Sequence, residues 1–391
     1  MFQDVDYFNI EELLTEEEKL ARNTARDFFE HEVRPLVVEA FHLERPLDWR
    51  RLAPELGRLG FIGPVIPAAY GGGGTNYTTC GLISREAEKV DSAVGGFIRE
   101  ETALVMYPVW RYGSETQKRR WLPAIARGEA IGCFGLTEPD AGSDVAAMTT
   151  TARRDGGEWV INGSKQWISE AADADMAVVW AQTGEGVRGF IVERGTAGFA
   201  QSFERRKGSM RAGDVGGLSF TDCRVPEDNA LPGALGLRPV LSCLDQARFA
   251  IAWGAIGVAA DCYETALGYA RERRQFDAPI ASYQLVQEKL VDMLVEITKG
   301  QLLAYRLGRL MDAGKAAYTQ ISLAKKNNAA VARMCAAARE LLGANGVSLE
   351  NSPIRHMANM ESVYTYQGTD HNYTLILGAD ITGIPAFRTK K

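Results

Sequence analysis

Cys133-Phe134-Gly135-Leu136-Thr137-Glu138-Pro139-Asp140-Ala141-Gly142-Ser143-Asp144 is the stretch that divides this chain into parts of different character. Before it, apolar residues recur at helical spacing, and after it short apolar runs are separated by turn residues. The stretch itself combines proline, glycine, hydroxyl and acidic side chains. Composition alone would make it an ordinary interdomain loop, so its meaning depends on the segments on either side.

The segment on the N-terminal side is predicted to be helical. Thr15 and Glu18 have the spacing of a capping box, in which each side chain bonds to the other residue's backbone N–H. Apolar residues then recur at helical spacing from Leu20 to Val33, and again in later stretches. We therefore expect an N-terminal helical domain over residues 1–129.

The middle segment is predicted to be a small β domain over residues 130–236. Asp155-Gly156-Gly157 lies between two strand-like runs and predicts a hairpin. Asn162-Gly163 predicts a second tight turn, followed by a strand that ends at Trp167-Ile168-Ser169. Further strand-like runs follow at 176–181, 189–192 and 217–226.

The last segment, residues 237–391, is predicted to be helical again. Apolar positions persist over 240–269, 285–310, 316–342 and 357–376, which predicts four long antiparallel helices. Within the fourth, Tyr366-Gln367-Gly368-Thr369-Asp370 indicates a helix end, a glycine break and a new helix capped by Thr369. Such a corner can hold one side chain at a fixed point.

Composition excludes several classes of function. The chain has 391 residues, a net charge of −6 and no block of Lys or Arg, so nucleic acid and anionic membranes are poor partners. Its six cysteines lack CxxC spacing and its four histidines form no ligand pattern, which predicts reduced thiols and no metal site. The N-terminus lacks a signal or transit pattern, so we predict a soluble bacterial cytoplasmic protein.

Together these motifs resemble the acyl-CoA dehydrogenase family over nearly the whole chain, and glutaryl-CoA dehydrogenases most closely. The resemblance rests on the 133–144 loop, Trp167-Ile168-Ser169, Arg271-Glu272-Arg273-Arg274-Gln275-Phe276, the 340–346 segment and the 366–370 corner. It implies a mainly α fold with a central small β-barrel domain and a C-terminal four-helix bundle. It also implies an oxidoreductase that binds FAD and forms a homotetramer, a dimer of dimers.

The resemblance also implies which residues contact the cofactor. In the family, the indole of the Trp-Ile-Thr/Ser element covers the flavin and its hydroxyl bonds near flavin N5, while an Arg and a Gln bind the pyrophosphate and adenosine across a subunit interface. Carried over, the expected FAD contacts are Phe134, Leu136, Thr137, Gly142, Ser143, Trp167, Ile168, Ser169, Arg273, Gln275, Phe276, Gln284, Glu340, Leu341, Gly343, Ala344, Thr369, Asp370 and Phe387.

The chain departs from the family at the catalytic base. The family motif at the corner is Tyr-Glu-Gly-Thr, but this chain has Gln367, whose neutral amide cannot accept the acyl α-proton. Some relatives place the base on the helix after residue 237, but the matching position here is Ala247. Three explanations stay open: an engineered change, a natural variant with other chemistry (decarboxylation or another elimination, hydroxylation, or oxidation with a different base), or a catalytically silent homologue.

A second departure concerns the acyl tail. Glutaryl-CoA dehydrogenases hold the distal carboxylate with an Arg that a Ser follows four residues later, and those positions match Gly95 and Arg99 here. Four residues are one helical turn, so the guanidinium has moved along one face. We expect Arg99 to hold a charged or polar tail, with Glu100 or Glu101, and more weakly Glu88, as a relocated base; a solvated helix turn is the alternative.

The resemblance implies a short acyl thioester as substrate, carried by CoA or by a carrier protein. The expected electron acceptor is an electron-transfer flavoprotein or O2. The expected substrate contacts are Arg99, Ser143, Leu244, Asp245, Arg248, Tyr366 and Gly368, with Gln367 at the base position.

Overall fold

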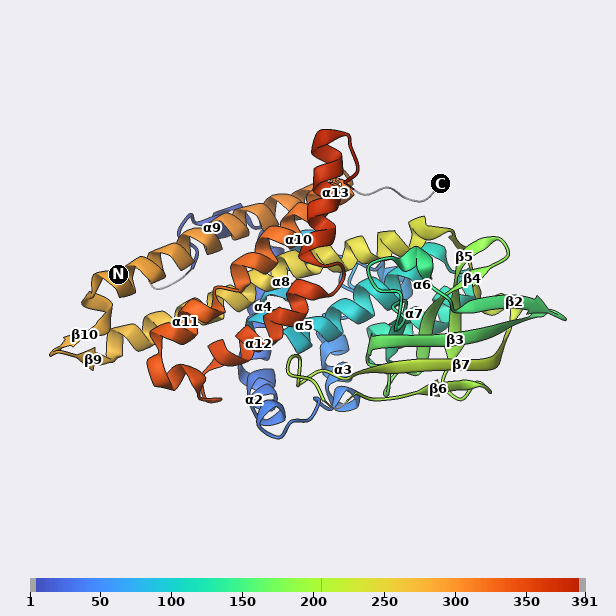
Figure 1. Cartoon of the computed structure of the whole chain (residues 1–391), viewed down its shortest axis with the longest axis horizontal. Helices are drawn as coiled ribbons and strands as arrows, with labels where there is room; N and C mark the ends of the chain where they lie inside the picture. The colour runs from blue at the N-terminus through green and yellow to red at the C-terminus, as the bar shows by residue number, and fades with distance from the viewer. Residues whose placement is uncertain (1–4, 205, 387–391) are drawn as a thin grey trace.

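A computed structural model describes residues 5–204 and 206–386. The chain forms an N-terminal group of helices, a β sheet and a C-terminal group of long helices (Figure 1). The fold class predicted from the sequence is therefore confirmed. In the described residues, no helix is both long enough and apolar enough to cross a membrane.

The N-terminal helices begin with the predicted capping box. Thr15 Oγ1 accepts a hydrogen bond from the Glu18 N–H at 3.2 Å, and a Glu18 carboxylate oxygen accepts from the Thr15 N–H at 2.9 Å. Two segments, η2 (Phe29–Val33) and η4 (Glu100–Met106), are π-helical. The elements are η1 (Ile10–Leu13), α1 (Glu16–Phe28), η2 (Phe29–Val33), α2 (Arg34–His42), α3 (Trp49–Arg58), η3 (Ala68–Tyr70), α4 (Tyr77–Val90), α5 (Ser92–Arg99), η4 (Glu100–Met106), α6 (Tyr107–Tyr112) and α7 (Glu115–Ala126).

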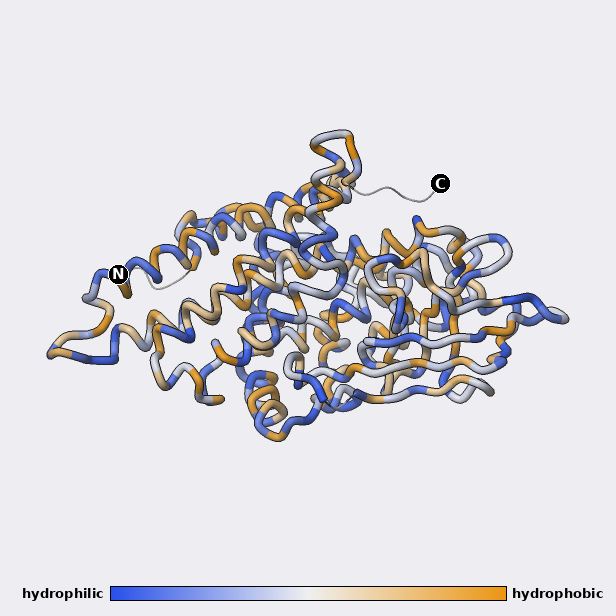
Figure 2. Tube along the Cα trace, viewed as in Figure 1, coloured by the Kyte–Doolittle hydropathy of each residue, from blue (hydrophilic) through white to orange (hydrophobic). Residues whose placement is uncertain are grey.

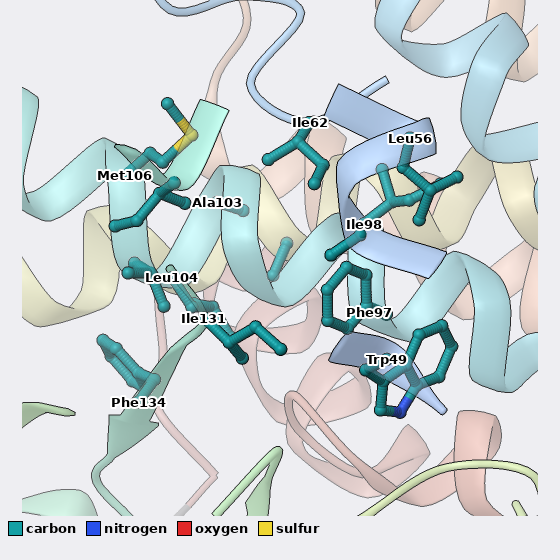
Figure 3. Packing of buried hydrophobic residues seen from close by; sticks show 14 of the residues in the cluster. Trp49, Leu56, Ile62, Phe97, Ile98, Ala103, Leu104, Met106, Ile131 and Phe134 are labelled. Carbon is teal, nitrogen blue, oxygen red and sulfur yellow. The ribbon is translucent and has the colours of Figure 1, made fainter. Parts of the chain in front are cut away.

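A hydrophobic core joins these helices to the first strand of the sheet, β1 (Gly132–Gly135). The rings of Trp49 and Phe97 stack with centroids 4.4 Å apart. Figure 3 shows the cluster continuing from this pair through Leu104 to Ile131 and Phe134 at the strand. Each fully buried side chain of this size contributes about 1.5–3 kcal/mol, so the core fixes β1 against η4.

The sheet has the order β6-β7-β3-β2-β4-β5-β8, and β1 pairs in parallel with β4. The hairpin predicted around Asp155-Gly156-Gly157 is present as β2 and β3. Its tip is hydrophilic (Figure 2), in keeping with the exposed Arg153 and Arg154. The remaining elements are η5 (Val145–Ala147), β2 (Thr151–Asp155), β3 (Glu158–Ser169), β4 (Met176–Thr183), β5 (Gly186–Glu193), β6 (Phe199–Gln201), β7 (Val215–Pro226), η6 (Glu227–Asn229) and β8 (Ala230–Leu235).

The predicted second turn at Asn162-Gly163 is wrong. β3 runs without interruption through these residues, and its pairing with β7 slips between Ile161 and Gly163, which is the mark of a bulge. Gly163 has φ 142°, and a Cβ there would lie 2.5 Å from Thr150 Oγ1. Gly163 therefore allows a bulge at which Thr150 lies close to the backbone of β3, and the strand continues beyond it.

The C-terminal helices differ in one respect from the four that the sequence predicts, because the third breaks near Arg333. The first two are continuous, and the fourth breaks at the 366–369 corner as predicted. The elements are α8 (Leu237–Glu272), β9 (Arg274–Gln275), β10 (Ala278–Pro279), η7 (Ile280–Ser282), α9 (Gln284–Asp312), α10 (Tyr318–Ala332), α11 (Cys335–Leu341), η8 (Gly343–Val347), α12 (Ser352–Thr365) and α13 (Asp370–Thr382).

Candidate functional site

The corner between α12 and α13 holds Gln367 in an unusual backbone conformation. Gln367 has φ 56° and Gly368 has φ 107°, and for a residue other than glycine the left-handed region costs roughly 1–2 kcal/mol. A Cβ on Gly368 would lie 3.0 Å from the Tyr373 hydroxyl oxygen. Thr369 caps α13 as predicted, because its Oγ1 accepts from the Asn372 N–H at 3.3 Å.

Buried donors hold three successive carbonyl groups of this corner. Lys325 Nζ donates to the carbonyl oxygens of Tyr366 and Gly368, at 3.2 and 3.1 Å. Arg248 Nε and the Tyr373 hydroxyl both donate to the Gln367 carbonyl, at 2.9 and 2.7 Å. Burial, followed by the nearby Arg248 and Arg99 charges, lowers the pKa of Lys325 to about 7.

Sequence reasoning did not assign Lys325 or Tyr373 to the site. The local sequence does not mark either residue, because the helical neighbours of each include both polar and apolar side chains. Gln367 Oε1 is buried and has no hydrogen-bond partner among the described residues, which is a feature of functional sites.

The predicted tail residue, Arg99, lies against the same corner. Its Nη2 donates to the Tyr366 hydroxyl at 2.9 Å, and its Nη1 donates to Glu88 Oε1, also at 2.9 Å. Arg99 and Glu88 are buried, with 6% and 1% of their surface exposed, and Tyr366 is half-buried. Burial raises the pKa of Glu88 to about 7, although the Arg99 guanidinium favours the charged form.

The predicted substrate contacts on α8 reach the corner through Arg248. Its Nη1 donates to Asp245 Oδ1 at 2.9 Å, and Leu244 is buried one residue earlier. The structure therefore brings together Arg99, Arg248 and the corner residues Tyr366, Gln367 and Gly368.

Glu100 and Glu101 face a different element. The two carboxylate oxygens of Glu101 accept from the Gly132 N–H of β1, at 2.9 and 3.2 Å. Burial raises the pKa of Glu100 to about 8 and that of Glu101 well above its ordinary value. Within residues 5–204 and 206–386, neither carboxyl group hydrogen-bonds to Gln367, so a role as relocated base stays a prediction.

A buried ion pair shapes the 133–144 loop. Lys165 Nζ donates to the Leu136 carbonyl at 3.0 Å and to Glu138 Oε1 at 2.9 Å. Burial opposes the charge on Glu138, but hydrogen bonds from Thr150 and Lys165 lower its pKa to about 2. These contacts fix the conformation of the loop at Leu136 and Glu138.

Of the predicted cofactor contacts in this loop, some face the core and others face solvent. The Phe134 ring packs in the core beside Trp180, with centroids 6.0 Å apart, and Leu136 is buried. Thr137 is half-buried, and Gly142 and Ser143 are exposed. The Phe134 and Leu136 side chains are therefore covered, whereas Gly142 and Ser143 are open to a ligand.

Trp167 is forced outward by a second bulge in β3. The pairing with β7 slips between Gln166 and Ile168, Trp167 has φ 61°, and its side chain is 60% exposed. Ile168 is buried and Ser169 is half-buried. A strained, exposed indole beside a hydroxyl is a feature that a planar ligand would explain.

The remaining predicted cofactor residues lie elsewhere. Those around β9 and α9 are exposed at the end of the molecule opposite the sheet (Figure 1), and Phe276, with φ 49°, is 92% exposed. Leu341 is buried, Asp370 pairs with Lys326, and Phe387 lies outside the described residues. The exposed members of this set are Arg273, Gln275, Phe276, Gln284, Glu340, Gly343 and Ala344.

Comparisons with known proteins cover the whole architecture. Residues 15–129, 133–223 and 235–381 match the models described as the N-terminal, middle and C-terminal domains of acyl-CoA dehydrogenase. A glutaryl-CoA dehydrogenase of Desulfococcus multivorans is 33% identical over 95% of this chain and 98% of its own. The short-chain specific acyl-CoA dehydrogenase of Homo sapiens is 31% identical over 94% and 90%.

Solved structures are similar over the same length. A glutaryl-CoA dehydrogenase of Mycobacterium smegmatis has a TM-score of 0.97 and 44% identity, covering 99% of this chain and 100% of its own. The same figures hold for that enzyme in complex with FADH2.

Proposed function

Because the chain belongs to the acyl-CoA dehydrogenase family, whose members are oxidoreductases that act on CH–CH groups, we propose that it is an FAD-containing flavoenzyme for a short acyl thioester with a polar end. The domain division proposed above, at 129/130 and 236/237, is supported by the family matches to 15–129, 133–223 and 235–381. The acyl group is carried by CoA or by a carrier protein.

The residues present fit FAD. The bulge that exposes Trp167 beside Ser169, and the open turn at Gly142 and Ser143, offer an aromatic face, hydroxyl groups and unhindered backbone. When bound, FAD would supply the hydride acceptor. Trp167 would cover its ring system, and Ser169 would donate a hydrogen bond to it.

The observation that carries the substrate proposal is the contact between Arg99 and the corner. The guanidinium is buried and reaches Tyr366, one residue from Gln367, so a tail bound by Arg99 would extend from an acyl chain lying along this corner. Arg248 would orient the thioester end by fixing the Gln367 carbonyl.

Gln367 limits the chemistry of the chain's own residues. An amide does not accept a proton at neutral pH, so removal of an α-proton lacks its usual acceptor. This favours a second candidate, a non-oxidising flavoprotein of lyase type such as a decarboxylase. There the C–C bond to a carboxylate breaks, CO2 leaves, and the electron pair left on the acyl carbon takes a proton from solvent, so no α-proton has to be removed. A hydroxylase, a silent binding homologue and an engineered variant are the remaining alternatives.

Gln367→Glu tests the proposal directly. Restoring the carboxylate should raise the rate of anaerobic flavin bleaching by butyryl-CoA or glutaryl-CoA roughly 10²–10⁴-fold, because a general base contributes about that factor. Gln367→Ala is the control and should not show the gain. If the Glu variant dehydrogenates no thioester, Gln367 does not lie over the acyl Cα. Product formation without bleaching by the wild type would instead support the lyase.

A further inference from the structure

Two glycines create the space in which the Glu88 side chain lies. Glu88 is on α4, and it points between Gly95 of α5 and Gly254 of α8. A Cβ built on either glycine would overlap the Glu88 side chain. The chain therefore accommodates a buried carboxyl group at the position where a larger residue 95 would lie.

This carboxyl group faces one cation directly. Arg99 Nη1 lies 2.9 Å from Glu88 Oε1, and with both groups charged the pair has no net charge. Asp91, the residue that follows α4, is itself paired with Arg355 at 3.0 Å. The groups around Glu88 on the elements packed against it are Asp91, Ser92, Arg99, Lys325 and Tyr366.

Within the described residues, the pair leaves one acceptor and one donor without partners. Glu88 Oε2 and Arg99 Nε are both buried, and neither has a partner in good hydrogen-bonding geometry. The Ser92 hydroxyl lies close enough to the Glu88 carboxyl group to favour its charged form. Burying such groups costs about 1–3 kcal/mol each, and a ligand that satisfies them explains why they persist. A ligand that hydrogen-bonds to both atoms must offer a donor to Glu88 Oε2 and an acceptor to Arg99 Nε.

We propose that Glu88 selects acyl thioesters by the charge of their tail. A neutral tail with a donor and an acceptor, such as a carboxamide, binds without a change in protonation. A carboxylate tail binds only together with one proton on Glu88. The proposal rests on the proposed function. A carboxylate offers acceptors only, so against an ionised Glu88 it would leave Oε2 unpaired and place two negative charges side by side. The pKa of about 7 means that this proton is available near neutral pH.

The test compares tails of equal size on the FAD-loaded protein. Glutaryl-CoA, its terminal amide 4-carbamoylbutyryl-CoA, and butyryl-CoA are titrated anaerobically by calorimetry at pH 8, in two buffers of different ionisation enthalpy. We expect uptake of nearly one proton with glutaryl-CoA and of none with the amide. Above pH 8 the affinity of the wild type for glutaryl-CoA should fall about tenfold per pH unit, while that for the amide stays constant.

The Glu88→Gln variant tests whether the proton taken up on binding is carried by Glu88. The variant should bind glutaryl-CoA at least about tenfold more tightly than the wild type at pH 8, without proton uptake. Glu86→Gln is the matched control, because Glu86 is buried on the same helix but pairs with Arg26 at 3.2 Å; it should behave as wild type.

Four results would overturn the proposal. Uptake that persists in Glu88→Gln would place the proton elsewhere, for example on Lys325, and uptake that is absent from the wild type would remove the linkage. Binding of butyryl-CoA but of neither polar tail would leave the proposed function intact and overturn the tail site. Failure of all three thioesters to bind would overturn the proposed function and this proposal with it.

Discussion

At the scale of single residues, the corner at Gln367 is fixed by more contacts than its local sequence supplies. Three consecutive carbonyl groups accept hydrogen bonds from Lys325, Arg248 and Tyr373, all of them buried. A backbone angle that costs energy persists only where its surroundings determine it in this way. The side chain at 367 is therefore presented at a defined point whether it is an amide or an acid.

Lys325→Met tests the contribution of the lysine. The change removes two hydrogen bonds and leaves the Tyr366 and Gly368 carbonyls unpaired, so the free energy of unfolding should fall by about 2 kcal/mol. Urea denaturation measures this difference. Lys326→Met is the control, since Lys326 is partly exposed and its pair with Asp370 should contribute less than about 1 kcal/mol. Equal losses in the two variants would show that burial of Lys325 has no special effect.

The sequence predicts the helix cap at this corner but not the contacts that Lys325 and Arg248 make with it. A glycine followed by Thr, Asp and an apolar helical pattern is enough to predict the cap at Thr369, because that hydrogen bond spans three residues. Lys325 and Arg248 are 41 and 119 residues away from their partners. No periodicity connects such positions, so only the fold shows that they meet.

At the scale of elements, four buried carboxyl groups gather where η4 meets the sheet. Glu100 and Glu101 come from η4, Glu170 follows β3, and Asp214 precedes β7. Burial raises the pKa of Glu170 well above its ordinary value and that of Asp214 to about 6, and the neighbouring carboxylates add to both rises. Ser169 ends β3, and Arg99 is the last residue of α5, directly before η4, so this packing connects the tail site with the predicted cofactor contacts.

Glu100→Gln should stabilise the protein at alkaline pH. The pKa of Glu100 rises from 4.5 to about 8 on folding, so the stability that it contributes is complete below pH 4.5 and is lost as pH rises through about 8. A neutral amide avoids that loss, and the thermal midpoint at pH 8.5 should rise by roughly 2 °C or more, with little change at pH 5.

The control for this prediction is Glu115→Gln, which removes a carboxylate from the exposed first turn of α7. It should not show the same difference between pH 5 and pH 8.5. A Glu100→Gln variant that is no more stable than wild type at pH 8.5 would mean that Glu100 is ionised in the folded protein at little cost.

β3 shows why the strands could be predicted from the sequence while the bulges within them could not. Asn162-Gly163 favours a tight turn when its neighbours are considered alone. In the fold, both halves of the strand pair with β7, and this tertiary pairing converts the expected turn into a bulge. The second bulge, at Trp167, had no sequence signal of its own, although the predicted role of the indole depends on it.

At the scale of the whole molecule, the predicted cofactor residues form two groups that are far apart within one chain. One group lies on β3 and the other near β9. Arg248, at the corner, and Glu272, at the end of α8, are separated along the helix by roughly 36 Å. Figure 1 shows β9 and β10 at one end of the long axis and the sheet toward the other. A single extended FAD molecule is shorter than this separation, so the two groups would serve one cofactor only if they came from different copies of the chain.

Complementation between two inactive variants tests this arrangement. Trp167→Ala/Ser169→Ala alters the group on β3, and Arg273→Ala/Phe276→Ala alters the exposed group near β9. Each variant alone should purify with little flavin, measured as the ratio of absorbance at 450 and 280 nm. When the two are co-expressed with different tags and isolated through both, a site shared between copies is intact in half of the positions of each mixed pair, so about half of the flavin content should return. If each site is instead built within one copy, every site in the mixed pair carries a defect, and the flavin content should stay as low as in the separate variants.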